Sequence, residues 1–347
     1  MAPNAAGASL GTLMEREAAE AGAAVSRMQA ANRDAIAQVA ARLRASPPAV
    51  VVTCARGSSD HAATYAKYLI ETLTGVPTAS AALSVASLYD APATPGNRLC
   101  LAISQSGKSP DLLATVEHQR KAGAFVVAMV NAEDAPLAAL ADVVIPLKAG
   151  PERSVAATKS YICSLAAIAA LVAAWAEDAT LADAVAGLPA QLERAFELDW
   201  SPAVTALTGA SSLFVLGRGY GYGIAQEAAL KFKETCALHA ESFSAAEVRH
   251  GPMAIVDEAF HVLAFASSDR AGTSVRETVA EFRSRGAEVL LADPAAPEAG
   301  LPAIAAHPAI EPILIVQSFY KMANALALAR GCDPDSPPHL NKVTETL

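Results

Sequence analysis

The stretch "AVVVTCARGSSDHAATYAKYLIE" (residues 49–71) decides the fold, because a β-branched run passes through an Arg-Gly turn into a helix-favouring segment. The stretch "SLFVLGRGYGYGIAQEAALKFKE" (residues 212–234) has the same pattern, and its Gly219 follows Gly57 by 162 residues. Each stretch therefore predicts one strand–helix unit of an α/β protein, and together they suggest that the unit occurs twice.

A second pair of stretches supports the repeat. Residues 99–131 and 261–293 both predict a strand, a loop, a helix, a glycine and another strand, and Gly123 and Gly286 are 163 residues apart. The strands are continuous apolar runs, which is typical of parallel sheets covered on both faces. We therefore expect two doubly wound parallel-sheet domains, each a three-layer αβα sandwich. Ligands of such sheets bind where loops leave the carboxyl ends of the strands.

The remaining segments complete the predicted organisation. The sequence favours a helical N-terminal segment and, because "DPDSPPHLNKVTETL" is rich in proline, an irregular C-terminal tail. The predicted parts are a helical segment at 1–45, a first sheet domain at 46–180, a helical connector at 181–200, a second sheet domain at 201–330 and a tail at 331–347.

Composition narrows the class of protein. The chain has 347 residues, 53% of them hydrophobic, and a net charge of −9 with no Lys/Arg cluster, which favours a globular enzyme over a nucleic-acid or membrane partner. The N-terminus lacks the features of a signal peptide, and the five cysteines contain no CxxC pair, so we expect a cytoplasmic protein with reduced thiols. The apolar run at 165–176 is too short to span a bilayer and predicts a buried helix.

The loop "SQSGKS" after the predicted strand at 99–103 carries the strongest binding signal. Its polar side chains lie just before a helix expected to begin near Pro110, and Gly107 allows close approach of the backbone. Hydroxyl groups and free N–H groups at a helix N-terminus suit a phosphate. An ordinary Ser/Gly turn that caps the helix explains the same residues. The candidate phosphate ligands in this loop are Ser104, Gln105, Ser106 and Ser109.

A second hydroxyl-bearing turn strengthens the phosphate hypothesis. Ser58 and Ser59 follow Gly57 at another strand end of the same half, so both turns can converge on one anion. The matching loops of the second half lack this pair of hydroxyl turns, which favours a single phosphate site in the first half. There is no GxxxxGK[ST] motif, and "GRGYGYG" is a weak dinucleotide signal without a matched acidic residue.

Candidate acid–base groups lie in the second half. Glu227, Lys231 and Glu234 recur at spacings of four and three, so they share one helix face, where surface ion pairs are the simplest explanation. His250, in "RHGP", follows no metal-ligand spacing. A solvated loop histidine is the ordinary alternative to a functional one. No metal and no other cofactor is expected.

Five motifs occur in an order that resembles the sugar isomerase (SIS) domain family. They are "SQSGKSPD", "GPERSVAATKSYI", "EAALKFKETCALHAES", "EVRHGPMAIVD" and "HLNKVTETL". Within this family, the chain resembles the isomerase half of glutamine–fructose-6-phosphate aminotransferase and the stand-alone amino-sugar phosphate deaminases. The resemblance covers nearly the whole chain.

The resemblance implies roles for particular residues. Glu234 would move a proton between C1 and C2 of an open-chain sugar, with Lys231 nearby to hold it ionised. His250 would promote ring opening from the neighbouring subunit, which implies a homodimer, and Lys342 would form an imine with a sugar ketone. The backbone of Val155, Ala156 and Ala157 would contact the sugar. Glu152 would bind a sugar hydroxyl or amine, or would instead pair with Arg153 or Lys148.

The expected reaction is deamination of glucosamine 6-phosphate to fructose 6-phosphate. The chain has no residues to spare for the glutamine-hydrolysing domain of the aminotransferases, and "NKVTETL" departs from their usual "AKSVTVE" ending. Other enzymes of the group remain alternatives, acting on galactosamine 6-phosphate or a glycated amino-acid phosphate, as a simple aldose–ketose isomerase, or in ammonia-dependent synthesis. A sugar-phosphate sensor is less favoured, because the first 45 residues show no basic recognition helix.

Overall fold

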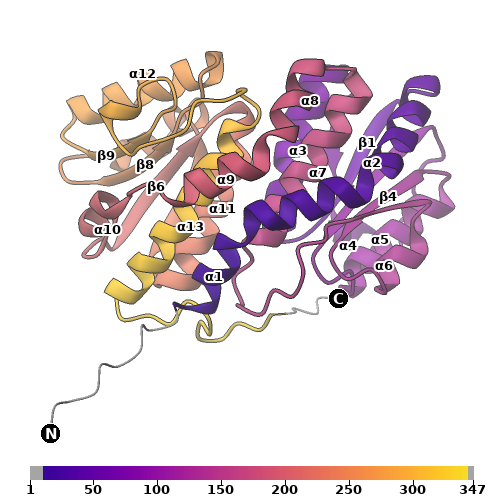
Figure 1. Ribbon diagram of the computed structural model, residues 1–347, viewed down its shortest axis with the longest axis horizontal. Coiled ribbons are helices and arrows are strands. Elements are labelled where there is room, and N and C mark those ends of the chain that lie inside the picture. Colours follow the sequence, from indigo (N-terminus) through magenta and orange to yellow (C-terminus); the bar gives the residue numbers. More distant parts are fainter. Residues whose placement is uncertain (1–10, 343–347) are drawn as a thin grey trace, which may run out of the picture.

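The computed structural model describes residues 11–342 and is an α/β protein with two parallel sheets (Figure 1). The first part of the chain forms α1 (Leu13–Ala19), α2 (Ala21–Ala45), β1 (Val50–Cys54), α3 (Ser58–Thr74), β2 (Thr78–Ser80), α4 (Leu83–Ser87), β3 (Arg98–Ser104), α5 (Pro110–Lys121), β4 (Phe125–Val130), α6 (Pro136–Leu140) and β5 (Val143–Pro146). The rest forms α7 (Lys159–Ala176), α8 (Ala179–Ala186), α9 (Leu188–Phe196), α10 (Ser201–Leu207), β6 (Ser212–Gly217), α11 (Tyr222–Cys236), β7 (His239–Ser244), β8 (His261–Phe265), α12 (Arg270–Ser284), β9 (Glu288–Ala292) and α13 (Glu311–Ala329).

The two sheets repeat one topology, as the sequence predicts. The strand order is β2-β1-β3-β4-β5 in the first sheet and β7-β6-β8-β9 in the second, with every pairing parallel. In each sheet the chain leaves its first strand to one side and then crosses to the other. The switch point of the strand order therefore lies between β1 and β3 in the first sheet and between β6 and β8 in the second. In open α/β sheets, ligands bind in the crevice at the carboxyl ends of the strands at such a point.

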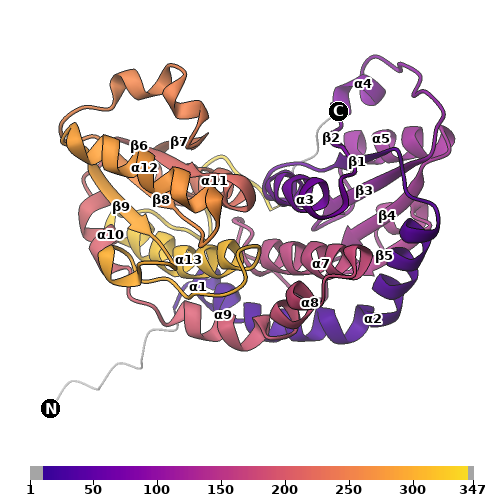
Figure 2. The same cartoon turned by 90° about the horizontal axis from the view of Figure 1, so that it is seen from above.

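Successive side chains of each strand point to opposite faces of its sheet, so the hydrophobic core has three parts. In β3, Leu99, Leu101 and Ile103 face a central core, which also includes Leu213 and Val215 of β6 and the apolar faces of the helices between the sheets. Cys100 faces the opposite way, toward α5. Figure 2 shows the two sheets on either side of these central helices. The opposite face of the first sheet packs against α5, and that of the second packs against α12. Both faces of each sheet are thus buried, which explains the continuous apolar runs.

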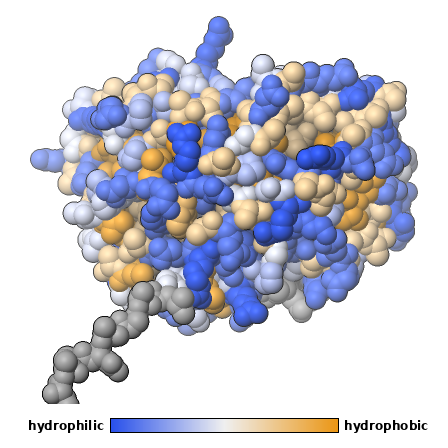
Figure 3. Space-filling model, in the orientation of Figure 1, coloured by the Kyte–Doolittle hydropathy of each residue, from blue (hydrophilic) through white to orange (hydrophobic). Residues whose placement is uncertain are grey.

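The run at 165–176 belongs to α7, and the prediction of a buried helix is confirmed. With 18 residues α7 is longer than the run suggested, so by length and composition α7 and α13 could each cross a membrane. However, 83% of the α7 window and 78% of the α13 window are buried inside the protein, as in core helices of soluble proteins. Polar side chains intersperse the apolar ones on the face shown in Figure 3.

The end of the chain has no helix or strand from residue 331 to 342, but it is anchored. The carboxylate of Asp335 accepts hydrogen bonds from the backbone N–H groups of Leu13 (2.6 Å) and Met14 (2.7 Å), at the start of α1. The backbone N–H of Val155 donates to the carbonyl of Asp335. From this anchor the chain continues to Lys342. The predicted tail residues 343–347 lie outside the described residues.

Candidate functional site

A cavity of about 370 Å³ opens at the switch point between β1 and β3. It brings together two loops that the sequence singles out, the turn after β1 and the loop after β3, and adds the end of the described chain. Eight of the predicted site residues line it: Ser58, Ser59, Ser104, Gln105, Ser106, Ser109, Ala157 and Lys342. We call this the first cavity.

The loop after β3 is held in one shape by its own residues. The Ser104 hydroxyl accepts a hydrogen bond of 2.9 Å from the backbone N–H of Gly107, and its own proton remains available to a ligand. Gly107 has φ +62°, and a Cβ at this position would lie 2.7 Å from the Cβ of Ala135. Only glycine fits that conformation and that space. Helix α5 then begins at Pro110, as predicted.

Two helix N-termini point to the first cavity. Helix α3 begins after Gly57 and α5 begins after Ser109, and neither of these residues caps its helix with a side-chain hydrogen bond. The N-terminal end of a helix carries a partial positive charge. In α5 this charge is the main contribution, because Pro110 has no N–H and the Leu112 N–H donates to Asp111 Oδ1. Together with the serine hydroxyls the two N-termini form an arrangement that suits a dianionic phosphate.

Arg56 also lines the first cavity, and the choice of candidate residues from the sequence missed it. Its guanidinium donates from Nε (3.0 Å) and from one terminal nitrogen (2.7 Å) to the same carboxylate oxygen of Asp111, which is fully buried. The Arg56 side chain itself remains 54% exposed, so it can still face a ligand. A signal was present, because Arg56 is the only charged residue in the turn between β1 and Ser58.

Glu227, Lys231 and Glu234 do share one face of α11, but this face is not a solvated surface. Glu227 and Lys231 are buried, and the Lys231 ammonium lies 3.2 Å from Glu227 Oε1 and 2.6 Å from Glu234 Oε2. The interpretation as surface ion pairs is therefore wrong. Glu234 is 22% exposed, so its carboxylate can meet a ligand.

Ser58 connects this buried cluster to the first cavity. Its hydroxyl donates to Glu227 Oε1 and accepts from Lys231 Nζ, both at 3.1 Å. Tyr320 donates to the same Glu227 oxygen at 3.0 Å, and His61 Nδ1 lies 3.0 Å from Glu227 Oε2. Because the Ser58 proton is already engaged, Ser59 is the better placed of the two serines to donate to a phosphate. Sequence reasoning missed His61 and Tyr320, since only the fold brings α3, α11 and α13 together.

The surroundings of Glu227 and Lys231 favour the ionised forms of both side chains. Burial raises the pKa of Glu227, but the Lys231 ammonium and the hydrogen bonds from His61 and Ser58 outweigh it and lower that pKa to about 2. Burial lowers the pKa of Lys231, but Glu227 and Glu234 outweigh it and hold that pKa well above its usual value. A buried, ionised network thus ties α11 to α3 and α13.

Glu152 lies behind the first cavity, where its partner is Lys342. The Lys342 ammonium donates to Glu152 Oε2 at 3.1 Å, and the other contacts of the carboxylate come from the backbone of Thr158 and from Ser160. Burial raises the pKa of Glu152, but Lys342 and these hydrogen bonds outweigh it, so the pKa lies below its usual value. The alternative pairing with Arg153 or Lys148 is wrong. The Arg153 backbone binds Glu17, and Lys148 pairs with Glu133.

The other predicted residues lie outside the wall of the first cavity. Ala156 is buried, and Val155 is half-buried with its N–H on the tail. His250 is exposed, in the loop between β7 and β8.

Comparisons with known proteins agree with this geometry. A family model described as "SIS domain" matches residues 48–174 and 206–293, which contain every strand of both sheets. The glutamine–fructose-6-phosphate aminotransferase (isomerizing) of Zymomonas mobilis is 33% identical over 311 residues, which are 84% of this chain and 51% of that protein. The chain spans about half the length of the curated relatives it matches.

Solved structures show the same similarity. A protein of Silicibacter pomeroyi, provisionally described as a phosphosugar isomerase, is 44% identical, with a TM-score of 0.88 over 93% of this chain and 100% of that one. The C-terminal domain of glucosamine-fructose-6-phosphate aminotransferase from Francisella tularensis is 25% identical. Its TM-score is 0.85, over 96% of this chain and 100% of that one.

Proposed function

Because the chain belongs to the SIS domain family, we propose that it is a phosphosugar enzyme of the isomerase type, and specifically a glucosamine-6-phosphate deaminase. One observation carries the proposal. The hydroxyl-lined first cavity, at two helix N-termini, is bordered by Lys342 and is connected through Ser58 to the ionised cluster that holds Glu234. Such a site can hold a sugar phosphate beside a carboxylate able to move a proton.

The proposed reaction begins with binding of the phosphate by Ser59, Ser104, Ser106 and Ser109 and by the two helix N-termini. In the open-chain amino sugar, Glu234 removes the proton from C2 and returns it to C1. Together with the passage of one proton from the amino nitrogen to O1, this transfer converts the 2-amino aldehyde into a 1-hydroxy-2-imine. Lys231, 2.6 Å from Glu234, fixes the position of the carboxylate during the transfer.

Lys342 can release the nitrogen at C2 of the sugar as ammonia. Its ammonium passes one proton to the nitrogen of the 2-imine, and the free amine then attacks C2 and expels ammonia, which leaves a protonated imine between Lys342 and the sugar. Water then hydrolyses this bond, releasing fructose 6-phosphate and the Lys342 ammonium. The balance is one water consumed and one ammonia released per glucosamine 6-phosphate. The 3.1 Å contact with Glu152 supports the role, because it holds the amine beside the cavity.

Ring opening is assigned to His250 of the partner subunit in a homodimer. The exposed position of His250 supports this assignment, since a side chain that serves a neighbouring site must lie on the surface of its own chain. An amino sugar is favoured because the curated relatives are named as aminotransferases that act on fructose 6-phosphate with isomerisation. The same proton transfer, in the opposite direction, accompanies release of ammonia.

Incubation of the protein with glucosamine 6-phosphate should release ammonia and fructose 6-phosphate in equal amounts. A coupled enzymatic assay measures each product. Galactosamine 6-phosphate and unphosphorylated glucosamine serve as controls for the C4 epimer and for the phosphate. Conversion of fructose 6-phosphate to an aldose phosphate without any ammonia release would instead identify a simple isomerase. Binding with no turnover would identify a sensor.

Borohydride reduction in the presence of fructose 6-phosphate should trap a covalent adduct at Lys342, detected by mass spectrometry of the tryptic peptides. The Lys342→Met variant should lose the adduct and keep the fold, because the described tail beyond the Asp335 anchor has no helix or strand. Lys159, buried and 2.5 Å from Glu20, is the internal control and should stay unmodified. An adduct at Lys159 or Lys231 in the wild-type protein would contradict the assignment.

A further inference from the structure

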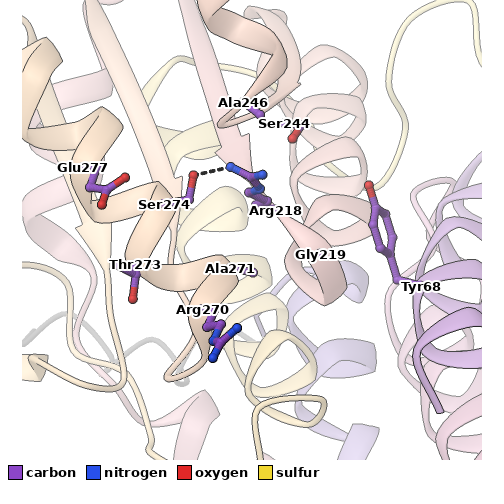
Figure 4. A pocket seen from close by; sticks show the side chains of 10 residues that line it. All are labelled: Tyr68, Arg218, Gly219, Ser244, Ala246, Arg270, Ala271, Thr273, Ser274 and Glu277. Carbon is purple, nitrogen blue, oxygen red and sulfur yellow. Dashed lines mark hydrogen bonds between the residues drawn. The ribbon is translucent and has the colours of Figure 1, made fainter.

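A second cavity, of about 560 Å³, lies at the carboxyl edge of the second sheet (Figure 4). It is bounded by the ends of β6 and β7 and by the first turns of α12, with α3 of the first half on the opposite side. The polar residues that matter to the argument are Tyr68, Arg218, Arg270, Thr273, Ser274 and Glu277. Its volume falls within the range of small-molecule sites and exceeds that of the first cavity.

The second cavity occupies the same topological place as the first. The first cavity lies where β1 and β3 diverge, and the second lies where β6 and β8 diverge, because α12 follows β8 directly. Arg218 and Gly219 in the second half correspond to Arg56 and Gly57 in the first. The fold thus builds the same ligand-binding crevice twice.

One difference between the two crevices changes their charge. Arg56 is neutralised by the buried carboxylate of Asp111, whereas Arg218 donates its hydrogen bond to the hydroxyl of Ser274. Ser274 follows Asp111 by 163 residues, the spacing of the repeat, so a serine stands at the equivalent position. Within residues 11–342, no ion pair engages Arg218 or Arg270.

The remaining charged groups show what kind of ligand fits. Glu277 lines the cavity and suits a hydroxyl or an amine rather than a phosphate. Asp269 caps α12, accepting the N–H groups of Ala271 and Gly272, so those N–H groups are not free for an anion. Arg218 and Arg270 are therefore the cationic groups of the cavity, although in Figure 4 their guanidinium groups point in different directions, so both would contact one phosphate only after a side-chain rotation. Planar guanidinium is well matched to phosphate oxygens.

We propose that the second cavity binds a sugar phosphate, with the phosphate on Arg218 and Arg270 and the sugar hydroxyls toward Glu277 and Thr273. This site is separate from the one assigned to the reaction, and it uses arginines where the first cavity uses hydroxyl groups. Each chain should then hold two sugar phosphates. The proposal adds a second site to the single phosphate site that the hydroxyl-bearing loops of the first half predict.

The test is isothermal titration of the full chain with fructose 6-phosphate as probe. We expect two molecules bound per chain, and one class of site weakened in Ser106→Ala. In that background, the pair Arg218→Ala and Arg270→Ala should weaken the remaining class by about tenfold or more, because charged hydrogen bonds to the phosphate are lost. Unphosphorylated fructose should not bind either class measurably.

Two further variants keep the result interpretable. The pair Arg283→Ala and Arg285→Ala removes the same charge from the opposite end of α12 and should leave binding unchanged. Ser274→Asp restores the pairing seen between Arg56 and Asp111 without removing an arginine, and it too should weaken the second class. Wild-type binding of one molecule per chain, or equal binding by the Arg218/Arg270 pair and the Arg283/Arg285 pair, would overturn the proposal, whatever the enzymatic assay shows.

Discussion

Replacing Glu234 by glutamine should lower kcat for glucosamine 6-phosphate by about 10²–10⁴-fold, the usual contribution of a general acid–base group. Glutamine has the same shape and can still accept a hydrogen bond from Lys231, so binding of the sugar phosphate should change little. Only the ability to take the C2 proton is lost. Steady-state kinetics measures the first effect, and titration with fructose 6-phosphate measures the second.

A matched control distinguishes this loss from a general effect of charge. Glu241 lies on β7 and is exposed, so Glu241→Gln removes one carboxylate from the same half without touching the cluster around Lys231. It should keep nearly full activity. If Glu234→Gln stays active, or if Glu241→Gln fails as severely, the base is another residue.

The same variant tests whether two subunits share the site. Mixed dimers of Glu234→Gln and His250→Ala chains should recover part of the activity, because one of the two sites in such a dimer carries both intact groups. Dimer formation is checked by mass measurement of the mixture. Confirmed mixed dimers without activity would mean that each chain completes its own site.

Replacing Glu227 by glutamine should lower the free energy of unfolding at pH 7 by roughly 3–5 kcal/mol, the cost typical of breaking a buried charged pair. The change leaves the buried Lys231 ammonium with Glu234 alone and weakens the contacts to His61 and Tyr320. Chemical denaturation measures the loss. The control is Glu281→Gln on α12, whose ion pairs with Arg249 and Arg285 lie near the surface and should cost less than about 1 kcal/mol.

The free energy of unfolding should fall at low pH because Glu227 becomes protonated. Because folding lowers its pKa from an ordinary 4.5 to about 2, the stabilisation is complete above pH 4.5 and is lost as the pH falls toward 2. Wild-type protein should therefore lose stability across that window. The Glu227→Gln variant, already less stable at pH 7, should lose less across the same window. Parallel curves for the two proteins would show that Glu227 does not titrate as described.

The repeat made the fold predictable from the sequence. Two Arg-Gly turns and two later glycines recur at nearly one spacing, and each marks the same step of a strand–helix unit, so two parallel sheets were predicted. The order of the strands, and with it the switch points, comes from the structure. The serine loops were predictable for the same reason, because loops at the carboxyl ends of neighbouring strands meet at one edge of a sheet.

The spacing of residues in the sequence could not predict contacts between segments that are far apart in the chain. Glu227 looked like half of a surface ion pair, because helical spacing shows which residues share a face but not what covers that face. The covering residues, His61 and Tyr320, come from helices far apart in the chain. Likewise, local sequence offered Arg153 or Lys148 as partners for Glu152, whereas the fold supplies Lys342, 190 residues away.

The anchor at Asp335 restricts where the Lys342 amine can move. Lys342 follows Asp335 by seven positions, a tether that reaches at most about 25 Å when fully extended. Since Asp335 is held on the first turn of α1, the amine is confined to a small volume that includes the first cavity. Its effective concentration at the cavity is therefore set by the tether and by the contact with Glu152, and it does not depend on how much protein is present.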